Sequence, residues 1–264
     1  MPRRIVIHAG FHKTGSSSVQ YCLRQNRPAL RPYLRSILRP GLKPVVSAAR
    51  GYSTWRDPVT LAKFRHRFEA VLRDVTGMPK RVLVLSAEEL SGHLPGRDGL
   101  HDYSAAVSLA TEMQGAVAHV MPGVPVTFCY MTRAPEPWLQ SAYWEHVKSS
   151  SLTLDFEAFA DRFPKAHQLE EIVAGIRRAV TTEVVSQPLD ALADLPAGPA
   201  SAVLDSCDVP AEVQAGLVQE VANVRADRHT LLQLLEINRT EPDPDKRRAA
   251  KAALLAQTTE AANV

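Results

Sequence analysis

A glycine-rich segment near the N-terminus has the composition of an anion-binding loop. Gly10 and Gly15 let the backbone curl so that successive N–H groups face one point, and Lys13 between them supplies a full positive charge. A helix expected to begin near Ser16 adds the partial positive charge of its N-terminus. The segment therefore predicts a site for a phosphate or a similar anion. Its residues in order are His8, Ala9, Gly10, Phe11, His12, Lys13, Thr14, Gly15, Ser16, Ser17 and Ser18.

The spacing of the two glycines matches only the first half of the nucleotide-triphosphatase motif GxxxxGKS/T. In that motif a lysine directly after the second glycine reaches the β- and γ-phosphates, and the next Ser or Thr holds Mg²⁺. Here Ser16 follows Gly15 directly, and Lys13 stands two residues before that glycine. Because the lysine–hydroxyl pair is not reproduced, the motif fails and no metal is predicted.

With a different alignment, residues 13–17 resemble the 5′-phosphosulfate loop of sulfotransferases, whose usual form is Lys-Ser/Thr-Gly-Ser/Thr-Ser/Thr. The resemblance is closest to bacterial members that open with His-x-Gly-x-x-Lys-Thr-Gly, which His8, Gly10, Lys13, Thr14 and Gly15 match. A loop of this kind belongs between a strand and a helix, which is where the sequence places it.

A second block of the same resemblance starts at Arg133. Residues 130–143 look like the bacterial form Arg-x-Pro-x5-Ser-x-Tyr, with Arg133 at the end of a strand and Ser141 on the next helix. The resemblance implies that both side chains hold the 3′-phosphate of the donor, the guanidinium by a bidentate contact and the hydroxyl as a donor. In the alternative interpretation, Arg133 pairs with a core carboxylate and Ser141 is an ordinary helix serine.

The third block, Ser86-Ala87-Glu88-Glu89-Leu90, resembles the Ser-x-Glu segment after the second strand of carbohydrate-type and bacterial sulfotransferases. Glu88 occupies the family's position for the base that takes a proton from the acceptor, and Glu89 is the reserve. Both acids would also suit an ordinary helix start. His12 and His93 are further alternatives because imidazole titrates in the right range, although a solvated or core role is expected for His93.

The resemblance implies a sulfotransferase that uses 3′-phosphoadenosine 5′-phosphosulfate and transfers its sulfuryl group in line to a hydroxyl or amine. The acceptor it implies is a small molecule, a lipid or a carbohydrate, bound by loops from residues 26–56, 91–102 and 145–165. The candidate catalytic residues are Lys13 and Glu88, which the resemblance implies, and His12, which is a candidate by its own chemistry. The implied donor-binding residues are Gly10, Lys13, Thr14, Gly15, Ser16, Ser17, Arg133 and Ser141.

Beyond about residue 150 the resemblance thins, and the Arg-Lys-Gly segment of cytosolic members is not found. Arg225, Arg24 or Arg27 could replace that clamp. Trp138 and Trp144 are interpreted either as adenine-stacking residues or, more simply, as packing residues. The rival functions are a P-loop kinase or nucleotide triphosphatase and a catalytically silent nucleotide-binding module.

The elements that must position these residues alternate between strands and helices. Apolar runs predict strands over residues 3–9, 80–87, 126–132 and 182–186. Helical spacing predicts helices over residues 16–25, 61–75, 103–121, 135–149 and 165–180, with an amphipathic segment over 246–257. Residues 26–56, which contain Pro28, Pro32, Pro40 and Pro44, are expected to form broken helices or a mobile excursion. The pattern predicts one α/β domain over residues 1–264, a P-loop-type three-layer α/β/α fold with a mainly parallel sheet and a helical C-terminal part.

Composition excludes several classes of protein. The chain of 264 residues is 45% hydrophobic and 22% charged, which is typical of a globular protein and not of collagen or a disordered chain. Cys22, Cys129 and Cys207 are odd in number and lack metal-ligand spacing, which indicates reduced thiols in a cytoplasmic protein. No apolar run reaches the roughly 18 residues of a membrane span. A secretory signal is not expected either.

Charge is distributed unevenly along the chain. Residues 1–56 contain 11 Lys or Arg and no Asp or Glu, whereas residues 57–264 hold the other 20 basic residues and all 28 acidic ones. This asymmetry predicts an anionic ligand near the N-terminus, with a solvated basic face as the simpler interpretation. Nucleic acid is not expected as a partner because the arginines lack interleaved aromatic residues and a recognisable reader motif.

Overall fold

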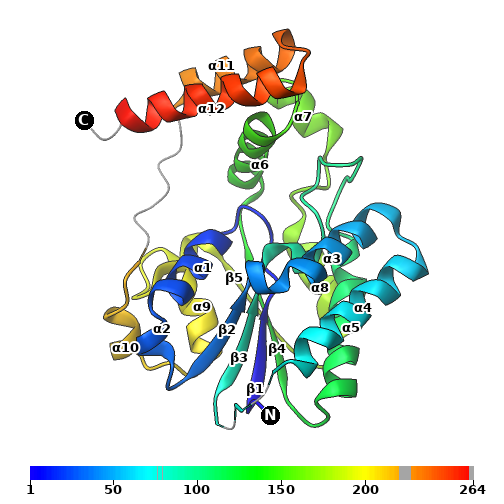
Figure 1. Ribbon diagram of the computed structural model, residues 1–264, viewed down its shortest axis with the longest axis vertical. Coiled ribbons are helices and arrows are strands. Elements are labelled where there is room, and N and C mark those ends of the chain that lie inside the picture. The colour runs from blue at the N-terminus through cyan, green and yellow to red at the C-terminus, as the bar shows by residue number, and fades with distance from the viewer. Residues whose placement is uncertain (76, 79, 220–226, 262–264) are drawn as a thin grey trace.

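A five-stranded parallel sheet forms the centre of the molecule. The computed structural model describes residues 1–75, 77–78, 80–219 and 227–261. Within these residues the strands lie in the order β2-β3-β1-β4-β5, and all neighbours are parallel (Figure 1). The strands are β1 (Arg4–His8), β2 (Leu34–Leu38), β3 (Val82–Ser86), β4 (Val126–Thr132) and β5 (Glu183–Pro188). Because β1 lies in the middle, the loop that follows it opens at the centre of the carboxyl edge, where open α/β sheets bind ligands.

Helices cover both faces of the sheet and its carboxyl end. They are α1 (Ser16–Gln25), α2 (Arg27–Leu30), α3 (Lys43–Trp55), α4 (Pro58–Arg73), α5 (Ala105–Val120), α6 (Pro135–Ser149), α7 (Phe156–Arg162), α8 (Leu169–Ala179), α9 (Ser201–Asp205), α10 (Ala211–Ala215), α11 (Arg228–Thr240) and α12 (Pro244–Ala261). The described residues also form the short 3-10 turns η1 (Arg39–Leu42), η2 (Glu88–Ser91), η3 (Leu189–Leu192) and η4 (Gly198–Ala200).

Alternating side chains of the central strand divide the hydrophobic core into two. Ile5 and Ile7 of β1 belong to the cluster that contains Phe64 of α4 and Leu109 of α5, whereas Val6 belongs to the cluster with residues of α1 and α9. Every residue of β3 and β4 is buried. This burial explains their continuous apolar sequences and confirms the predicted three-layer α/β/α fold with a parallel sheet.

The expectation for residues 26–56 was wrong. This segment contains α2, the edge strand β2 and the 13-residue helix α3. Its prolines do not break these elements, because Pro28 and Pro44 occupy the first positions of α2 and α3, where the missing N–H needs no partner. Arg35 and Ser36 obscured β2 in the sequence, since an edge strand keeps one side in solvent.

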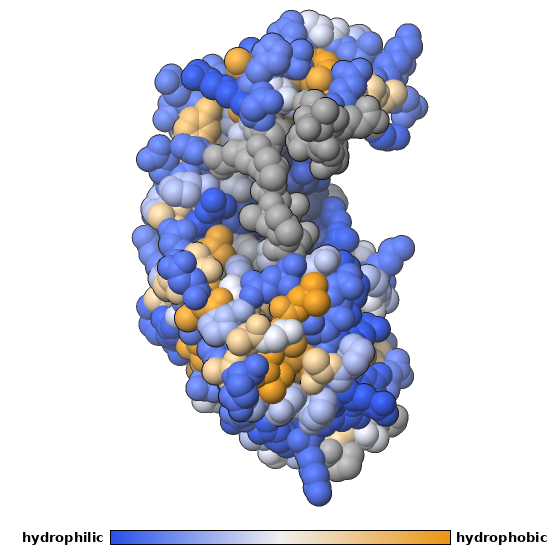
Figure 2. All heavy atoms as spheres, turned by 90° about the vertical axis from the view of Figure 1, so that its left-hand side faces the viewer, coloured by the Kyte–Doolittle hydropathy of each residue, from blue (hydrophilic) through white to orange (hydrophobic). Residues whose placement is uncertain are grey.

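The C-terminal helices α11 and α12 form a layer above α6, at the carboxyl end of the sheet (Figure 1). Asn238 of α11 donates from Nδ2 to Val147 O of α6 at 3.0 Å, which joins the two helices directly. Seen from the side of α2 and α10, the surface is mostly hydrophilic, with apolar groups gathered in the lower half (Figure 2). In the described part of the chain, no helix combines the length and apolar character needed to cross a membrane.

Candidate functional site

The loop between β1 and α1 turns on three residues in the left-handed region of backbone space. These are Gly10 (φ 43°), Lys13 (φ 66°) and Gly15 (φ 90°). Glycine adopts this conformation without strain, whereas a lysine does so at a cost of about 1 kcal/mol or more. Thr14 Oγ1 donates to Phe11 O at 2.8 Å and accepts from Phe11 N at 3.3 Å. The Thr14 hydroxyl therefore stabilises the turn of the loop through two hydrogen bonds to the backbone of Phe11. Lys13, which the sequence predicts to contact the ligand, is the non-glycine residue of the three and carries the backbone strain.

Both glycines are required by close approach as well as by conformation. A Cβ at Gly10 would lie 2.7 Å from Ser16 Oγ, 3.3 Å from His8 Nε2 and 3.7 Å from Glu88 Cα. A Cβ at Gly15 would lie 2.8 Å from a leucine side chain of η3. The space beside Gly10 is thus bounded by the first hydroxyl of α1, by the ring of His8 and by the backbone of Glu88, which brings two of the three sequence blocks together.

His8, at the end of β1, lies against the loop beside Gly10, and one of its ring nitrogens makes no hydrogen bond to a described residue. Its side chain is fully buried, and its Nδ1 lies 2.8 Å from Ser86 Oγ at the end of β3. Among the described residues, Nε2 has no hydrogen-bond partner. Burial lowers the pKa of His8 to about 4, so the ring is neutral at pH 7.

Three side chains from other parts of the chain form hydrogen bonds with the backbone of the loop. Tyr103 accepts from His12 N at 3.2 Å, and its hydroxyl lies 2.9 Å from His12 Nδ1. The indole N–H of Trp138 donates to His12 O at 2.9 Å, and Arg133 NH1 donates to Lys13 O at 3.1 Å. Trp138 is fully buried in this position, so it packs against the loop and cannot stack on an exposed adenine.

The structure brings Arg133 into contact with the loop, and it places Ser141 on α6 one turn before Glu145, whose carboxylate contacts Lys13. Ser141 is half-buried on α6, and none of the contacts within the described residues joins it to the loop. Ser16 is buried and its Oγ donates to Phe11 O at 3.2 Å, whereas Ser17 is exposed at the start of α1. Of the two serines expected to contact a phosphate, Ser17 has the more accessible hydroxyl.

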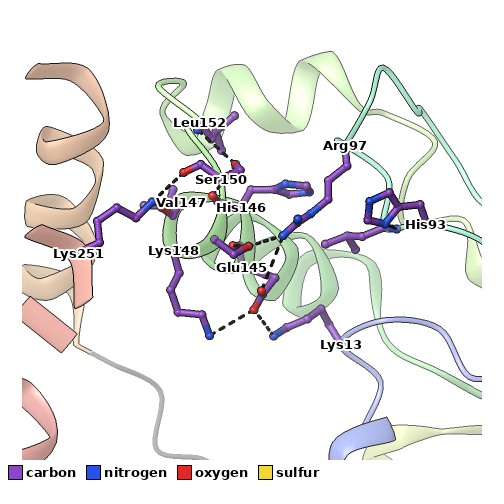
Figure 3. Close-up of polar contacts among 12 residues, drawn as sticks. Lys13, His93, Arg97, Glu145, His146, Val147, Lys148, Ser150, Leu152 and Lys251 are labelled. Carbon is purple, nitrogen blue, oxygen red and sulfur yellow. Dashed lines mark hydrogen bonds and ion pairs between the residues drawn. The ribbon is translucent and has the colours of Figure 1, made fainter. Parts of the chain in front are cut away.

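Lys13 takes part in a charged cluster around Glu145 of α6 (Figure 3). Its Nζ lies 3.3 Å from Glu145 Oε2, and Lys148 Nζ lies 3.4 Å from the same oxygen. Arg97 NH2 lies 4.0 Å from Glu145 Oε1. Burial opposes the charge of Glu145, but Lys13 and Lys148 outweigh it and hold the pKa of this carboxyl below its usual value. Lys13, Lys148 and Arg97 therefore surround the Glu145 carboxylate, which competes with an anionic ligand for these cations.

Glu88 and Glu89 have different surroundings although they are adjacent. Glu88 is half-buried, and its Oε2 accepts from Gln20 Nε2 at 2.8 Å. Burial and then the charge of Glu89 raise the pKa of Glu88 above its usual value. Glu89 is buried and forms an ion pair with Arg39 Nε at 2.7 Å. A carboxylate with a raised pKa and no cation bound to it is the better proton acceptor, which favours Glu88.

His12 and His93 lie close together and are both neutral at pH 7. Their ring centroids are 6.5 Å apart. Burial, His93 and the cation Arg97 hold the pKa of His12 well below its usual value. Burial and then the charge of Arg50, whose NH2 donates to His93 Nε2 at 3.0 Å, lower the pKa of His93 to about 4. His93 is buried, as expected for a core histidine, but its ring also lines a cavity.

That cavity has a volume of about 1070 Å³, and the His93 ring that lines it lies 6.5 Å from the ring of His12 in the loop. Three cations line it, namely Arg39, Lys43 and Arg50, together with the exposed indole of Trp55 and the acid Asp98. Its remaining lining residues are Pro40, Val46, Ser47, Gly51, Thr54 and His93. Residues 26–56 and 91–102, two of the segments expected to form an acceptor pocket, supply this entire lining.

The residues present fit an anionic phosphate group at the loop. The observations that indicate this are the glycine cradle, which a Cβ would fill, and the orphaned Nε2 of His8 beside it. Lys13, Arg133 and Arg97 supply positive charge around the same point. Arg225, considered as an additional clamp, lies outside the described residues. In the described part of the chain, no group of three or more His, Cys, Asp or Glu side chains is arranged to hold a metal.

Tyr103, Glu145 and Arg97 contribute to the site but were not predicted from the sequence. One signal for Glu145 was available, since Ser141, Glu145 and Lys148 recur at helical spacing and therefore share one face of α6. No comparable local pattern marks Tyr103 or Arg97, because both reach the site from the irregular segment between β3 and α5.

In comparisons with known proteins, no family model matches this chain, and no curated protein matches it either. The residues of the site itself therefore carry the evidence for function.

Proposed function

We propose that this protein is a sulfotransferase that uses 3′-phosphoadenosine 5′-phosphosulfate as its donor. The observation that carries the proposal is the hydrogen bond of 3.1 Å from Arg133 NH1 to Lys13 O, which joins two sequence blocks separated by 120 residues. The resemblance assigns one block to the 5′-phosphosulfate and the other to the 3′-phosphate. A single site made from both blocks is what binding of a bisphosphorylated nucleotide requires.

The donor would be held by the chain's own amides and cations. The loop amides and the N-terminus of α1 face the 5′-phosphate, and Ser17 offers an accessible hydroxyl. Lys13 turns from Glu145 toward the ligand and stabilises the negative charge that develops on the leaving phosphate. Arg133 approaches from the end of β4 with a guanidinium suited to the 3′-phosphate.

Acceptor activation would depend on Glu88. The bound donor supplies an activated sulfuryl group, and transfer of this group leaves the nucleotide bisphosphate. The raised pKa of Glu88 makes its carboxylate a stronger base than an exposed glutamate, so it can take the proton of a hydroxyl or amine. The basic cavity beside His93 is the route by which such an acceptor would reach the loop.

Calorimetric titration of the purified protein with 3′-phosphoadenosine 5′-phosphate, beside ATP with Mg²⁺, tests the donor site. We expect the bisphosphate to bind in preference to ATP. Lys13→Ala and Arg133→Ala should each weaken it by about tenfold or more, because each removes a charged contact worth roughly 1.5–3 kcal/mol. Lys63→Ala and Arg162→Ala, exposed positions on α4 and α7, are the matched controls and should change affinity by less than about twofold.

Preference for ATP with Mg²⁺ would overturn the proposal in favour of a P-loop kinase or nucleotide triphosphatase. Equal weakening by the control variants would mean that general charge, and not this site, binds the nucleotide. If the bisphosphate binds at this site but no hydroxyl or amine in a broad acceptor screen accepts a sulfuryl group, the protein is a silent nucleotide-binding module.

A further inference from the structure

A basic groove along the edge of the sheet is left unexplained by the proposed donor site. This groove, of about 510 Å³, runs beside β2 between α1, α2 and η1. Five arginines line it, and they are Arg24, Arg27, Arg31, Arg35 and Arg81. Its other lining residues are Gln20, Leu23, Leu30, Leu34, Ser36, Ile37, Leu38, Pro40 and Gly41. The groove thus has an apolar floor and a cationic rim, and none of the described residues that line it is acidic.

The charges of the groove are not neutralised within the described part of the chain. No described carboxylate lies within 4.0 Å of any of these five guanidinium groups. Arg24, Arg27, Arg31 and Arg35 are exposed, and Arg81 is half-buried. Like charges gathered around one groove repel one another, and an anionic partner relieves that repulsion.

The strand beside the groove offers a free edge for pairing. Val82 N of β3 donates to Tyr33 O at 2.9 Å, so the backbone of Tyr33, and by alternation that of Arg35 and Ile37, points toward β3. The N–H and C=O groups of Leu34 and Ser36 consequently point to the outer side of β2. No described residue makes a hydrogen bond to these outward groups. A free strand edge of this kind is a template for an added strand.

We propose that this groove docks an extended acidic polypeptide segment, which pairs with β2 through its backbone and with the arginines through its carboxylates. The two observations favour a peptide over a nucleic acid. A nucleic acid has no backbone amides to pair with a strand edge, and the described lining of the groove contains no aromatic residue for bases to stack on. The proposal also assigns a role to four of the eleven basic residues that make residues 1–56 so asymmetric in charge.

The groove ends close to the candidate active site. Gln20 lines the groove and donates to Glu88 Oε2 at 2.8 Å. A segment docked along β2 therefore lies next to the proposed base. The docking inference does not depend on the proposed function, since it uses only the charge of the groove and the free edge of β2.

Fluorescence anisotropy with a short dye-labelled peptide of alternating glutamate and threonine tests the inference on the full chain. A peptide with glutamine in place of glutamate tests the charge, and one N-methylated at alternate residues tests the strand pairing. An oligothymidylate of equal charge tests the nucleic-acid alternative. The groove variant is Arg31→Ala, Arg35→Ala and Arg81→Ala combined. The control combines Arg162→Ala, Arg178→Ala and Arg228→Ala, which are exposed positions outside the groove with the same change in net charge.

We expect the glutamate peptide to bind at least about tenfold more tightly than the glutamine and N-methylated peptides. The groove variant should lose about tenfold in affinity for it, and the control variant less than about twofold. Equal losses in the two variants, or equal affinity for the N-methylated peptide, would overturn the proposal. The proposal would also be overturned if the oligothymidylate bound more tightly than the glutamate peptide and the groove variant abolished that binding. Binding of 3′-phosphoadenosine 5′-phosphate, measured on the same variants, should stay unchanged, which separates this proposal from the donor site.

Discussion

Lys13 is held by an internal counter-ion before any ligand arrives. The carboxylate of Glu145 lies 3.3 Å from its Nζ and also contacts Lys148 and Arg97. An anion that binds at the loop must compete with this carboxylate for the ammonium group. Glu145 therefore sets how readily the cluster accepts a ligand.

Glu145→Gln should tighten binding of 3′-phosphoadenosine 5′-phosphate by about fivefold, or roughly 1 kcal/mol, because it removes that competition. Isothermal calorimetry measures the change. Glu157→Gln, an exposed position on α7 with the same change in charge, should have little effect. Weaker binding by Glu145→Gln would show instead that the carboxylate positions Lys13 for the ligand.

Glu88 should titrate at higher pH than an exposed glutamate, because burial and then the charge of Glu89 raise its pKa. NMR of ¹³C-labelled glutamate carboxyls measures this, with the Glu88 signal assigned by its loss in Glu88→Gln. In Glu89→Gln the pKa of Glu88 should move down toward the usual value, since the neighbouring negative charge is gone. A Glu88 signal that titrates with the exposed glutamates in both proteins would contradict its role as the base.

At the scale of elements, the buried carboxylate of Glu69 links helices α4 and α5. Glu69 of α4 accepts from Arg65 at 3.1 Å and from Arg73 at 2.7 Å, and its Oε1 lies 3.0 Å from His119 Nδ1 of α5. The hydrogen bond with His119 lowers the pKa of Glu69 most, and the two arginines lower it further. Burial acts in the opposite direction, but the net result is a pKa of about 2. The helix pair forms one layer behind the sheet, so this link supports the face that carries β1 and its loop.

Glu69→Gln should reduce the free energy of unfolding by about 1 kcal/mol at pH 7, because its three partners are all partly exposed. The folded-state pKa lies below the unfolded value of 4.5, so the carboxylate stabilises the fold above pH 4.5. That contribution disappears as the pH falls toward about 2. Urea unfolding at pH 7 and pH 3 should show that the wild type and Glu69→Gln differ less in their free energy of unfolding at pH 3 than at pH 7. The control Glu112→Gln, which removes one ion pair with Arg65, should change the free energy of unfolding by less. If the difference between the wild type and Glu69→Gln stays constant with pH, Glu69 does not stabilise the fold through its charge.

At the scale of the whole molecule, one buried lysine joins the C-terminal layer to the helix that carries Ser141 and Glu145. Lys251 of α12 donates from Nζ to Val147 O at 2.6 Å, to Ser150 O at 2.7 Å and to Asn238 Oδ1 at 2.9 Å (Figure 3 shows Lys251 reaching α6). Burial, and then Arg247, lower the pKa of Lys251 to about 8, so it still carries its charge at neutral pH. A cation at this place also suits the negative end of α6.

Lys251→Met should loosen α12 without unfolding the sheet, because it removes three hydrogen bonds to the end of α6 and to α11, and among the described residues only Val147 O keeps a second donor, Asn238 Nδ2. Hydrogen exchange followed by mass spectrometry should show at least about tenfold faster exchange in α11 and α12, with β1, β3 and β4 unchanged. Lys246→Met, an exposed position on the same helix, is the control. Unchanged exchange in the variant would mean that apolar contacts alone hold this layer in place.

Local pattern was sufficient for most of the fold. β1, β3 and β4 are short apolar runs buried on both faces, and α1, α4, α5 and α6 repeat their apolar residues at helical spacing, so each element shows its type in its own sequence. Gly10 and Gly15 likewise predicted a loop whose backbone curls, and the structure places both glycines, and Lys13 between them, in the left-handed region. The α/β class with a parallel sheet followed from the alternation of these elements and was confirmed.

Tertiary structure decided what depends on distant partners. β2 was missed because an edge strand needs only one neighbour and keeps polar residues on its open side. The sequence identified Arg133 and Lys13 separately, but their contact spans 120 residues, and the Lys13–Glu145 pair spans 132. Periodicity reports which face of an element is buried and carries no information about which other element covers it. The sequence by itself thus determined the loop and the elements around it, whereas the counter-ion of Lys13 and the groove beside β2 exist only once the sheet is assembled.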